Sequence, residues 1–284
     1  MYKENRIIPA LIILFCLNVL AWLTVFDLNK YGSLEVDFFD IGQGDAIFIE
    51  TSDNHQILID GGPGSVVLEK LGAEMPFWDR TIDLIILTHP HEDHVSGLIK
   101  VLENYEVENV LWTGISMETA IFKKWQEAIK EAKIYTAQSG QMVIADKMVL
   151  EIIYPFESLE NREVKNIDDT SIVSRLVFGD NSFLFTGDAF QSVEKQMVER
   201  GIYLSSGILK VGHHGSKTSS SQEFIEKVLP EMAVISAGKD NKYGHPNQET
   251  LATLEKYGIR IFRTDQQGDI KIICNGKNYA VSNF

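Results

Sequence analysis

A short apolar strand followed by a dense histidine cluster limits the folds that this chain can adopt. Residues 82–87 read Ile-Asp-Leu-Ile-Ile-Leu, which is typical of a strand buried on both faces. Residues 95–103 then have the apolar spacing of a helix. Between them, residues 89–94 read His-Pro-His-Glu-Asp-His. Because α/β proteins commonly place their sites at the carboxyl ends of buried strands, we predict an α/β fold with a site here.

The chemistry of this cluster points to metal binding. Three of the seven histidines of the chain lie within these six residues. Neutral imidazole and carboxylate are natural ligands of Zn²⁺, Mn²⁺ and Fe. His89 and His91 are two residues apart and can converge on one ion, whereas Asp93 and His94 can serve a second. The alternative is a solvated polar turn, but so dense a pattern rarely follows a buried strand by chance.

The motif resembles the metal motif of the metallo-β-lactamase superfamily. Further motifs at residues 36–46, 57–62, 185–189, 209–216 and 243–246 resemble the C-terminal hydrolase domain of ComEC-type competence (DNA-uptake) proteins, so that the resemblance covers about residues 34–281. It implies a four-layer αββα fold over residues 31–284 and two divalent metal ions, Zn or Mn, as cofactors.

The resemblance also implies a ligand set. Asp188 follows a predicted strand and matches the aspartate that bridges the two metals, although a helix N-cap is an alternative role for it. Many superfamily members have a further histidine that is missing here, since no histidine lies between His94 and His213. Asp168 or Asp169 can take that position, and we place Asp169 in the set. The predicted ligands are His89, His91, Asp93, His94, Asp169, Asp188, His213 and His214. Of the last two, one is expected to be a ligand and the other to lie in the second shell or face the substrate.

Residues around the ligands are assigned supporting roles. Asp60 is expected to orient the metal loop from the second coordination shell, and Asp40 and Asp45 to act similarly, unless they only stabilise turns. The hydroxyl-rich loop after His214 predicts phosphate contacts from Ser216, Lys217 and Ser219, with plain helix capping as the alternative. His245 is expected at the rim, as a phosphate contact, a proton donor or a ligand. The predicted catalytic residues are Asp93, Asp188 and His245.

The N-terminus predicts a membrane anchor. Residues 7–26 are uncharged and mostly apolar, and as a helix they span about 30 Å, the thickness of a hydrocarbon core. Lys3 and Arg6 precede this run, which favours a hydrolase domain outside the cytoplasmic membrane. We predict an anchor and linker over residues 1–30. A cleaved signal peptide, with secretion, and a buried core helix are the alternatives.

Composition and charge restrict the function. A formal net charge of -14 is not typical of a tight, non-specific duplex binder, although bound divalent ions invert the local field. The resemblance, rather than the composition, implies a two-metal phosphodiesterase or nuclease. The alternatives are hydrolysis of another ester, of phosphorylcholine or β-lactam type, and a non-catalytic accessory protein of DNA uptake. The expected partners are a phosphodiester substrate such as DNA, the membrane through residues 7–26, and other competence or transport proteins.

Overall fold

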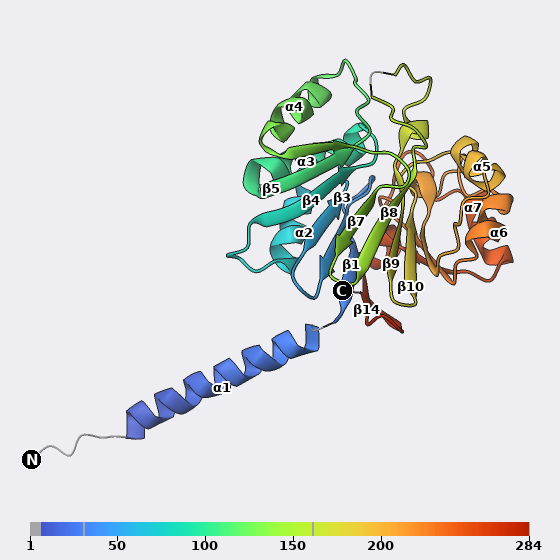
Figure 1. Cartoon of the computed structure of the whole chain (residues 1–284). Helices are drawn as coiled ribbons and strands as arrows, with labels where there is room; N and C mark the ends of the chain where they lie inside the picture. Colours follow the sequence, from blue (N-terminus) through green and yellow to red (C-terminus); the bar gives the residue numbers. More distant parts are fainter. Residues whose placement is uncertain (1–6, 31, 161, 284) are drawn as a thin grey trace, which may run out of the picture.

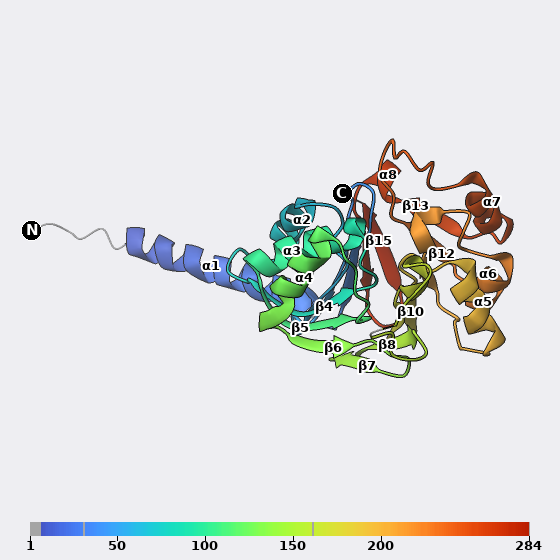
Figure 2. The same ribbon diagram turned by 90° about the horizontal axis from the view of Figure 1, so that it is seen from above.

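Two β-sheets packed face to face form the centre of the protein (Figures 1 and 2). The computed structural model describes residues 7–30, 32–160 and 162–283, and the side chains of residues 7, 23–30 and 283 lie outside the described part. The first sheet has the order β15-β14-β1-β2-β3-β4-β5-β6, and the second has the order β13-β12-β11-β10-β9-β8-β7.

The strands of the first sheet are β1 (Leu34–Phe38), β2 (Ile47–Thr51), β3 (Gln56–Ile59), β4 (Thr81–Leu87), β5 (Glu106–Trp112), β6 (Lys133–Thr136), β14 (Ile270–Cys274) and β15 (Tyr279–Asn283). Those of the second are β7 (Met142–Ala145), β8 (Met148–Tyr154), β9 (Val173–Phe178), β10 (Asn181–Phe185), β11 (Ile208–Lys210), β12 (Met232–Ile235) and β13 (Arg260–Arg263). The strand predicted over residues 82–87 is β4, which begins one residue earlier, at Thr81.

Helices cover the outer face of each sheet. The first sheet carries α2 (Val66–Glu74), α3 (Glu92–Asn104) and α4 (Ala120–Ala128), and the second carries α5 (Gln191–Glu199), α6 (Gln222–Val228) and α7 (Gln248–Lys256) (Figures 1 and 2). Short helical turns η1 (Ile129–Glu131), η2 (Asp168–Thr170), η3 (Gly212–Gly215) and α8 (Thr264–Gln267) connect these elements. The predicted four-layer α/β arrangement is confirmed.

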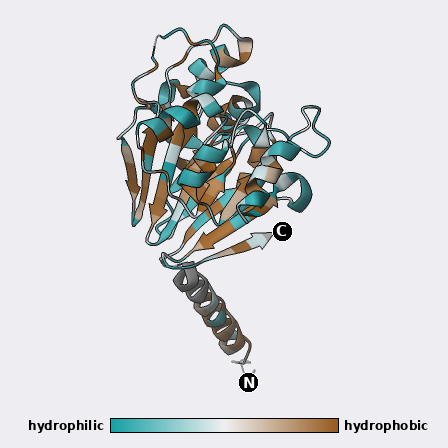
Figure 3. Ribbon diagram, turned by 90° about the vertical axis from the view of Figure 1, so that its right-hand side faces the viewer, coloured by the Kyte–Doolittle hydropathy of each residue, from teal (hydrophilic) through white to brown (hydrophobic). Residues whose placement is uncertain are grey.

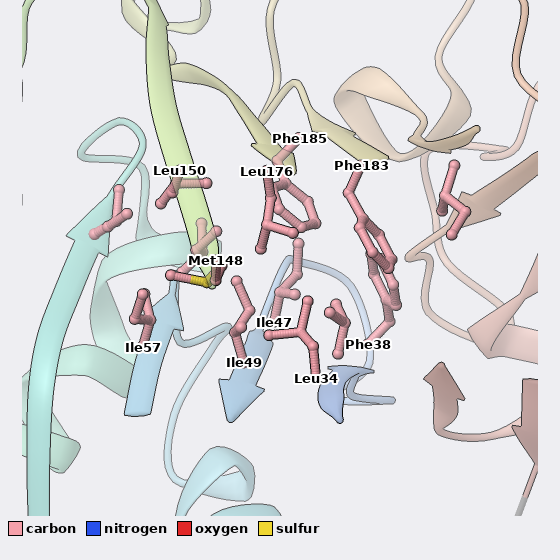
Figure 4. Packing of buried hydrophobic residues seen from close by; sticks show 14 of the residues in the cluster. Leu34, Phe38, Ile47, Ile49, Ile57, Met148, Leu150, Leu176, Phe183 and Phe185 are labelled. Carbon is pink, nitrogen blue, oxygen red and sulfur yellow. The ribbon is translucent and has the colours of Figure 1, made fainter. Parts of the chain in front are cut away.

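Alternating side chains of the strands build the central core. On β1, Leu34 and Phe38 point between the sheets, where they meet residues such as Leu176 and Phe183 from the second sheet (Figure 4). The opposite faces of the strands pack under the helices, for example through the fully buried Trp125 of α4. Burial on both faces explains why β4 reads as a continuous apolar run rather than an alternating one.

Strand direction brings the polar loops of both sheets to one end of the molecule. β3 and β4 run parallel, and β1 has the same direction because two antiparallel pairings separate it from β3. The loops after these strands, residues 39–46, 60–65 and 88–91, therefore leave from one edge. In the second sheet β10, β11 and β12 are mutually parallel, and the loops after them carry Asp188, His213, His214 and His245.

The N-terminal residues form α1 (Ile7–Lys30), which extends away from the sheets (Figure 1). The side chains of residues 8–22 are exposed, and most of them are apolar (Figure 3). Within the described part of the chain, no helix is long and apolar enough to cross a membrane. The transmembrane helix predicted over residues 7–26 is thus not supported by the structure, and the side chains of residue 7 and residues 23–26 lie outside the described residues.

Two glycines allow α3 to dock directly on the loop after β3. The Gly61 N–H donates to the His94 carbonyl at 2.9 Å, and the Gly97 N–H donates to the Gly62 carbonyl at 2.9 Å. A Cβ atom on Gly97 would lie 1.8 Å from the Gly61 carbonyl oxygen, well inside van der Waals contact. This close approach fixes the first turn of α3, and with it His94, against the loop that carries Asp60.

We predict that Gly97→Ala lowers the free energy of unfolding by about 1–3 kcal/mol, because the methyl group forces two backbone segments apart. Gly72→Ala is the matched control, since Gly72 is also helical and a Cβ there meets nothing within 4 Å. It should be neutral or stabilising by about 0.5–1 kcal/mol. Urea unfolding of the three proteins measures the difference, and equal stabilities of the two variants would contradict the role of Gly97.

Candidate metal centre

Histidines and carboxylates from both sheets meet at the shared end of the strands. Several groups of three have ligand atoms that all lie within 4.8 Å of one another. They include His89 with His91 and Asp168, His89 with His94 and Asp188, Asp93 with His94 and His214, and Asp45 with Asp188 and His214. The residues predicted on the β4–α3 loop and on the second sheet are therefore brought together across about a hundred residues of sequence.

Asp188 lies at the middle of this cluster. Its Oδ2 atom lies 3.4 Å from Nε2 of His94 and 3.4 Å from Nε2 of His214. Nε2 of His89 and of His213 lie 4.0 Å and 3.9 Å from the same oxygen. Asp188 itself follows β10 and is almost fully buried. One carboxylate oxygen is thus surrounded by four imidazole nitrogens from the two sheets.

The same four histidines are all held through Nδ1. His94 Nδ1 lies 2.8 Å from Asp60, and His214 Nδ1 lies 3.0 Å from the Ser236 carbonyl oxygen. His89 Nδ1 lies 3.1 Å from the Thr88 hydroxyl, and His213 Nδ1 lies 2.9 Å from the Thr218 hydroxyl. Both hydroxyls donate their own proton elsewhere, to Asp60 and to Ser216, so they accept from the rings. Each ring therefore keeps its Nε2 lone pair for a ligand, the arrangement of a metal-binding histidine.

The ligand group that contains His89 and His91 includes Asp168 rather than Asp169. Asp168 Oδ1 lies 3.0 Å from His91 Nδ1 and 3.6 Å from His89 Nε2. The Asp169 carboxylate instead accepts a hydrogen bond from the Ser192 hydroxyl. Both residues belong to η2, a single helical turn, which directs neighbouring side chains to different sides. The ligand position that sequence analysis gave to Asp169 is occupied by Asp168.

The second group joins Asp93 and His94 of α3 to His214. Asp93 Oδ2 lies 3.6 Å from His214 Nε2. His213 and His214 both have positive φ, 48° and 54°, a rare backbone conformation outside glycine. Because of it, both adjacent rings face Asp188, and His214 lies nearer to it than His213 does. Which of the two is a ligand stays a prediction.

Asp60 supports two ligands at once. It accepts hydrogen bonds from the Thr88 N–H at 2.8 Å and the Thr88 hydroxyl at 2.7 Å, in addition to its contact with His94. Through Thr88 it also fixes His89. Asp45 contacts His214 Nδ1 at 3.3 Å and pairs with Lys210. Asp40 is different, since within the described residues its hydrogen bonds run to the Gly42 turn and to Asp269 rather than to the histidines.

Sequence analysis missed Lys210. This lysine is fully buried, and its ammonium donates to the Gly187 carbonyl at 3.0 Å and lies 4.0 Å from Asp188. A buried lysine needs a compensating partner, which Asp45 supplies. The sequence does contain a signal for this role, because Lys210 is a single charged residue at the end of the apolar strand over residues 208–210.

The hydroxyl-rich loop after His214 supports the ligands from behind. The Ser219 hydroxyl donates to the Gly212 carbonyl at 2.6 Å, and Ser216 accepts from Thr218, which holds His213. A cavity of about 310 Å³ opens at the centre, and the residues that line it do not include Ser216, Lys217 or Ser219. The structure thus does not place these three predicted phosphate contacts in the cavity.

The walls of the cavity include His245 as well as the ligands. They are formed by Gln43, His91, Glu92, Asp93, Asp168, Asp188, His213, His214, Tyr243 and His245. The His245 ring packs against His213 with ring centroids 5.4 Å apart. Burial, followed by the neighbouring histidines, lowers the pKa of His245 to about 4. His245 is therefore at the rim, as the sequence predicted.

The electrostatics of the centre fit a bound cation. Burial lowers the pKa of His94 and of His214, but the surrounding carboxylates, Asp188 first, outweigh it and raise both values above the usual range. Burial likewise opposes the charge of Asp188, yet His214 and His94 hold the pKa of its carboxyl well below its usual range. The carboxylates thus create a field that favours positive charge.

Buried polar atoms that lack a hydrogen-bond partner also indicate a divalent metal site. Among the described residues, buried side-chain atoms without a hydrogen-bond partner include His94 Nε2, His214 Nε2, Asp168 Oδ1 and Asp188 Oδ1. Buried polar atoms are rarely left without a partner unless they have a function or bind an ion. All four are atoms that ligate divalent metals in proteins. The residues present therefore match a divalent metal site.

We predict that Asp60→Asn weakens divalent metal affinity about 10- to 100-fold, because an amide has one oxygen and cannot accept all three hydrogen bonds that the carboxylate accepts from the Thr88 N–H, the Thr88 hydroxyl and His94. Asp40→Asn is the matched control, since Asp40 caps a nearby turn without touching the histidines. Competition with a fluorescent chelator measures the affinities, with circular dichroism to verify folding. Equal affinities of the two variants would show that Asp60 does not hold the ligands.

Comparison with known proteins agrees with this geometry. The model of the metallo-beta-lactamase superfamily matches residues 39–239. ComE operon protein 3 of Bacillus subtilis (strain 168) is 32% identical over 276 residues, covering 90% of this chain and 35% of that protein. Competence protein ComA of Neisseria gonorrhoeae is 32% identical over 243 residues, covering 83% and 32%. The chain spans about a third of the length of these relatives.

A solved structure shows the same fold. The metallo-beta-lactamase fold protein YhfI from Bacillus subtilis superposes with a TM-score of 0.54 at 12% sequence identity, covering 81% of this chain and 96% of that one. The family model, the relatives and the histidine groups of the site all indicate the same superfamily. The chain belongs to the metallo-beta-lactamase superfamily of hydrolases, and its competence-related homologues confirm the resemblance expected from the motifs.

Proposed function

We propose that this hydrolase is a two-metal phosphodiesterase that acts on nucleic acid. The observation that carries the proposal is the position of Asp188 Oδ2 between two groups of ligands. His89, His91 and Asp168 form one group, and Asp93, His94 and His214 form the other. A carboxylate in that position suits a bridge between two ions, and paired ions suit in-line displacement at phosphorus.

The balance of charge supports two divalent ions. Five carboxylates contribute to the cluster or hold its ligands, namely Asp45, Asp60, Asp93, Asp168 and Asp188. Lys210 neutralises one of these charges. Four negative charges remain when the histidines are neutral, which two divalent cations balance. Asp168 in place of a histidine makes the first group richer in oxygen, which favours Mn²⁺ over Zn²⁺.

The chain's own residues would bind the ions and orient the substrate. Bound divalent ions would supply Lewis acidity, polarising the phosphoryl group and lowering the pKa of an attacking water. Asp188 orients that water from its central position. His245 presents a buried Nδ1 without a partner among the described residues, which suits a hydrogen bond to substrate. The names of the relatives, competence proteins, support DNA as the substrate and DNA uptake as the setting.

We predict metal-dependent cleavage of phosphodiesters by the full chain. The assay uses single- and double-stranded DNA, RNA and bis-p-nitrophenyl phosphate with MnCl₂ or ZnCl₂, and EDTA should abolish turnover. Asp188→Ala and Asp168→Ala should each lose at least about 100-fold in rate, because removing a few kcal/mol of stabilisation costs a factor of ten per about 1.4 kcal/mol. Asp169→Ala is the matched control and should keep most of the activity.

Two outcomes would contradict the proposal. If the wild type and Asp188→Ala are equally inactive on every phosphodiester, the chain is not a phosphodiesterase. Turnover of a phosphorylcholine ester or of a β-lactam under the same conditions would then identify another hydrolase activity. Equal losses in Asp168→Ala and Asp169→Ala would contradict the assignment of the first ligand group.

We also propose that the hydrolase domain lies outside the cytoplasmic membrane, held there by α1. The support is the uncharged run over residues 7–26 after Lys3 and Arg6, together with the exposed apolar side chains of residues 8–22. Such a surface is suited to contact with lipid.

We predict that the full chain sediments with membranes and resists extraction at alkaline pH. Protease added to intact spheroplasts should degrade the hydrolase domain, because it faces outward. A variant that starts with Met followed by Ser33 serves as the control and should remain inside the cell in the soluble fraction. Recovery of the full chain in the soluble cytoplasmic fraction would refute the anchor.

A further inference from the structure

We propose that Tyr243 is a stacking platform for an unpaired nucleobase beside the metal centre. The proposal rests on the phosphodiesterase function above and specifies its substrate as a nucleic acid strand with an unpaired base next to the scissile phosphate. It assigns to this chain a base-binding position that the metal ligands alone do not imply.

The tyrosine ring lies at the mouth of the catalytic cavity. Tyr243 lines the same cavity of about 310 Å³ as Asp168, Asp188 and His213, yet its side chain remains 59% exposed. One side of the ring stacks on His245, with centroids 5.9 Å apart and an angle of 24° between the planes. The exposed remainder of the ring is available to a flat ligand. The cavity is at the lower end of the volumes that bind small molecules, about 300–1,000 Å³.

The loop that carries Tyr243 is organised by Asn241. The Asn241 carbonyl oxygen accepts from the Tyr243 N–H at 3.2 Å and the His245 N–H at 3.0 Å. Its amide group donates to the carbonyls of Gly238 at 2.9 Å and His245 at 2.5 Å. Four hydrogen bonds from one side chain thus fix the path of the loop before substrate arrives. A preorganised platform loses little entropy on binding, which favours affinity.

An unpaired base is the ligand that this arrangement suits. Every base offers a π face, and stacking on an exposed aromatic ring needs no particular sequence. The exposed Lys242 ammonium lies over the Tyr243 ring, 5.3 Å from its centroid, so this flexible side chain must swing aside when a base stacks there and can then contact the adjoining phosphate. A base within a duplex is already stacked on its neighbours and cannot stack on the tyrosine without being unpaired. The net charge of -14 also disfavours broad binding along a duplex backbone.

The acidic wall of the cavity does not conflict with a polyanionic substrate. Glu92 and Asp93 are acidic residues that also line the cavity. Divalent ions in the two ligand groups would reverse the local field and attract the phosphate. The base would then be held by Tyr243 and the phosphate by the ions, which sets the distance between the stacked ring and the scissile bond.

Binding of labelled decanucleotides tests the proposal without turnover. Fluorescence anisotropy with Ca²⁺ in place of Mn²⁺, so that a divalent ion is present to attract the phosphate, compares a thymidine strand with a strand of the same length in which the bases are replaced by abasic residues. We expect wild type and Tyr243→Phe to prefer the strand with bases by at least about fivefold, the lower range of base–aromatic stacking. Tyr243→Ala should bring this ratio close to one. Phe77→Ala is the matched control, because Phe77 is 81% exposed and precedes β4, at the end remote from the metal centre.

Cleavage kinetics with Mn²⁺ provide the second measurement. In Tyr243→Ala, KM for the thymidine strand should rise at least about fivefold with a smaller change in kcat, and Tyr243→Phe should restore KM. If Tyr243→Ala keeps the preference for bases in both measurements, or if Phe77→Ala loses it equally, the stacking platform is refuted. If the wild type binds with a base preference but cleaves neither strand, the platform stands and the phosphodiesterase function fails.

Discussion

The structure depends on holding four histidines by one nitrogen so that the other faces a buried carboxylate. Asp188 approaches Nε2 of His89, His94, His213 and His214, while Nδ1 of each ring is fixed by a carboxylate, a hydroxyl or a carbonyl group. Each partner of Nδ1 determines the tautomer and the orientation of its ring. So many polar groups can be buried together only when their geometry is fixed and their charge is compensated.

The fold supplies this geometry through the direction of its strands. The carboxyl ends of β3 and β4 in one sheet, and of β10 and β11 in the other, lie at a common end. The loops after β4, β10 and β11 and the start of α3 deliver most of the ligands, the loop after β3 carries the supporting Asp60, and Asp168 comes from η2 between β8 and β9. The contact between Gly61 and Gly97 then locks α3 onto the loop of Asp60. Positive φ at His213 and His214 allows two adjacent side chains to face one point. The strained backbone at His213 and His214 and the close contact of the two glycines are maintained because extensive hydrophobic clusters pack around them.

Much of the fold and most of the ligand cluster could be predicted from sequence, for identifiable reasons. The apolar run of β4 and the dense motif after it are local patterns, so they were readable without any knowledge of tertiary contacts. The choice between Asp168 and Asp169 depends on which side of a single helical turn faces the histidines, and spacing does not encode that. Lys210 was overlooked because its partner, Asp45, is 165 residues away in sequence. The serines after His214 have the composition of an anion site, but the Ser219 hydroxyl donates to the Gly212 carbonyl and Ser216 accepts from Thr218, so these two hydroxyls hold the loop rather than face the cavity.

Lys210 balances part of the negative charge of the centre from within the protein. Its ammonium permanently compensates Asp45 and lies within 4.0 Å of Asp188, so part of the carboxylate charge is balanced by the protein itself. The raised pKa values of His94 and His214 show that protons can compensate further charge at the same positions. Metal binding must then displace those protons, because a ligating imidazole is neutral at its donor nitrogen. Metal affinity is therefore linked to pH through the histidines, whereas the Lys210–Asp45 pair supplies part of the charge compensation from within the protein.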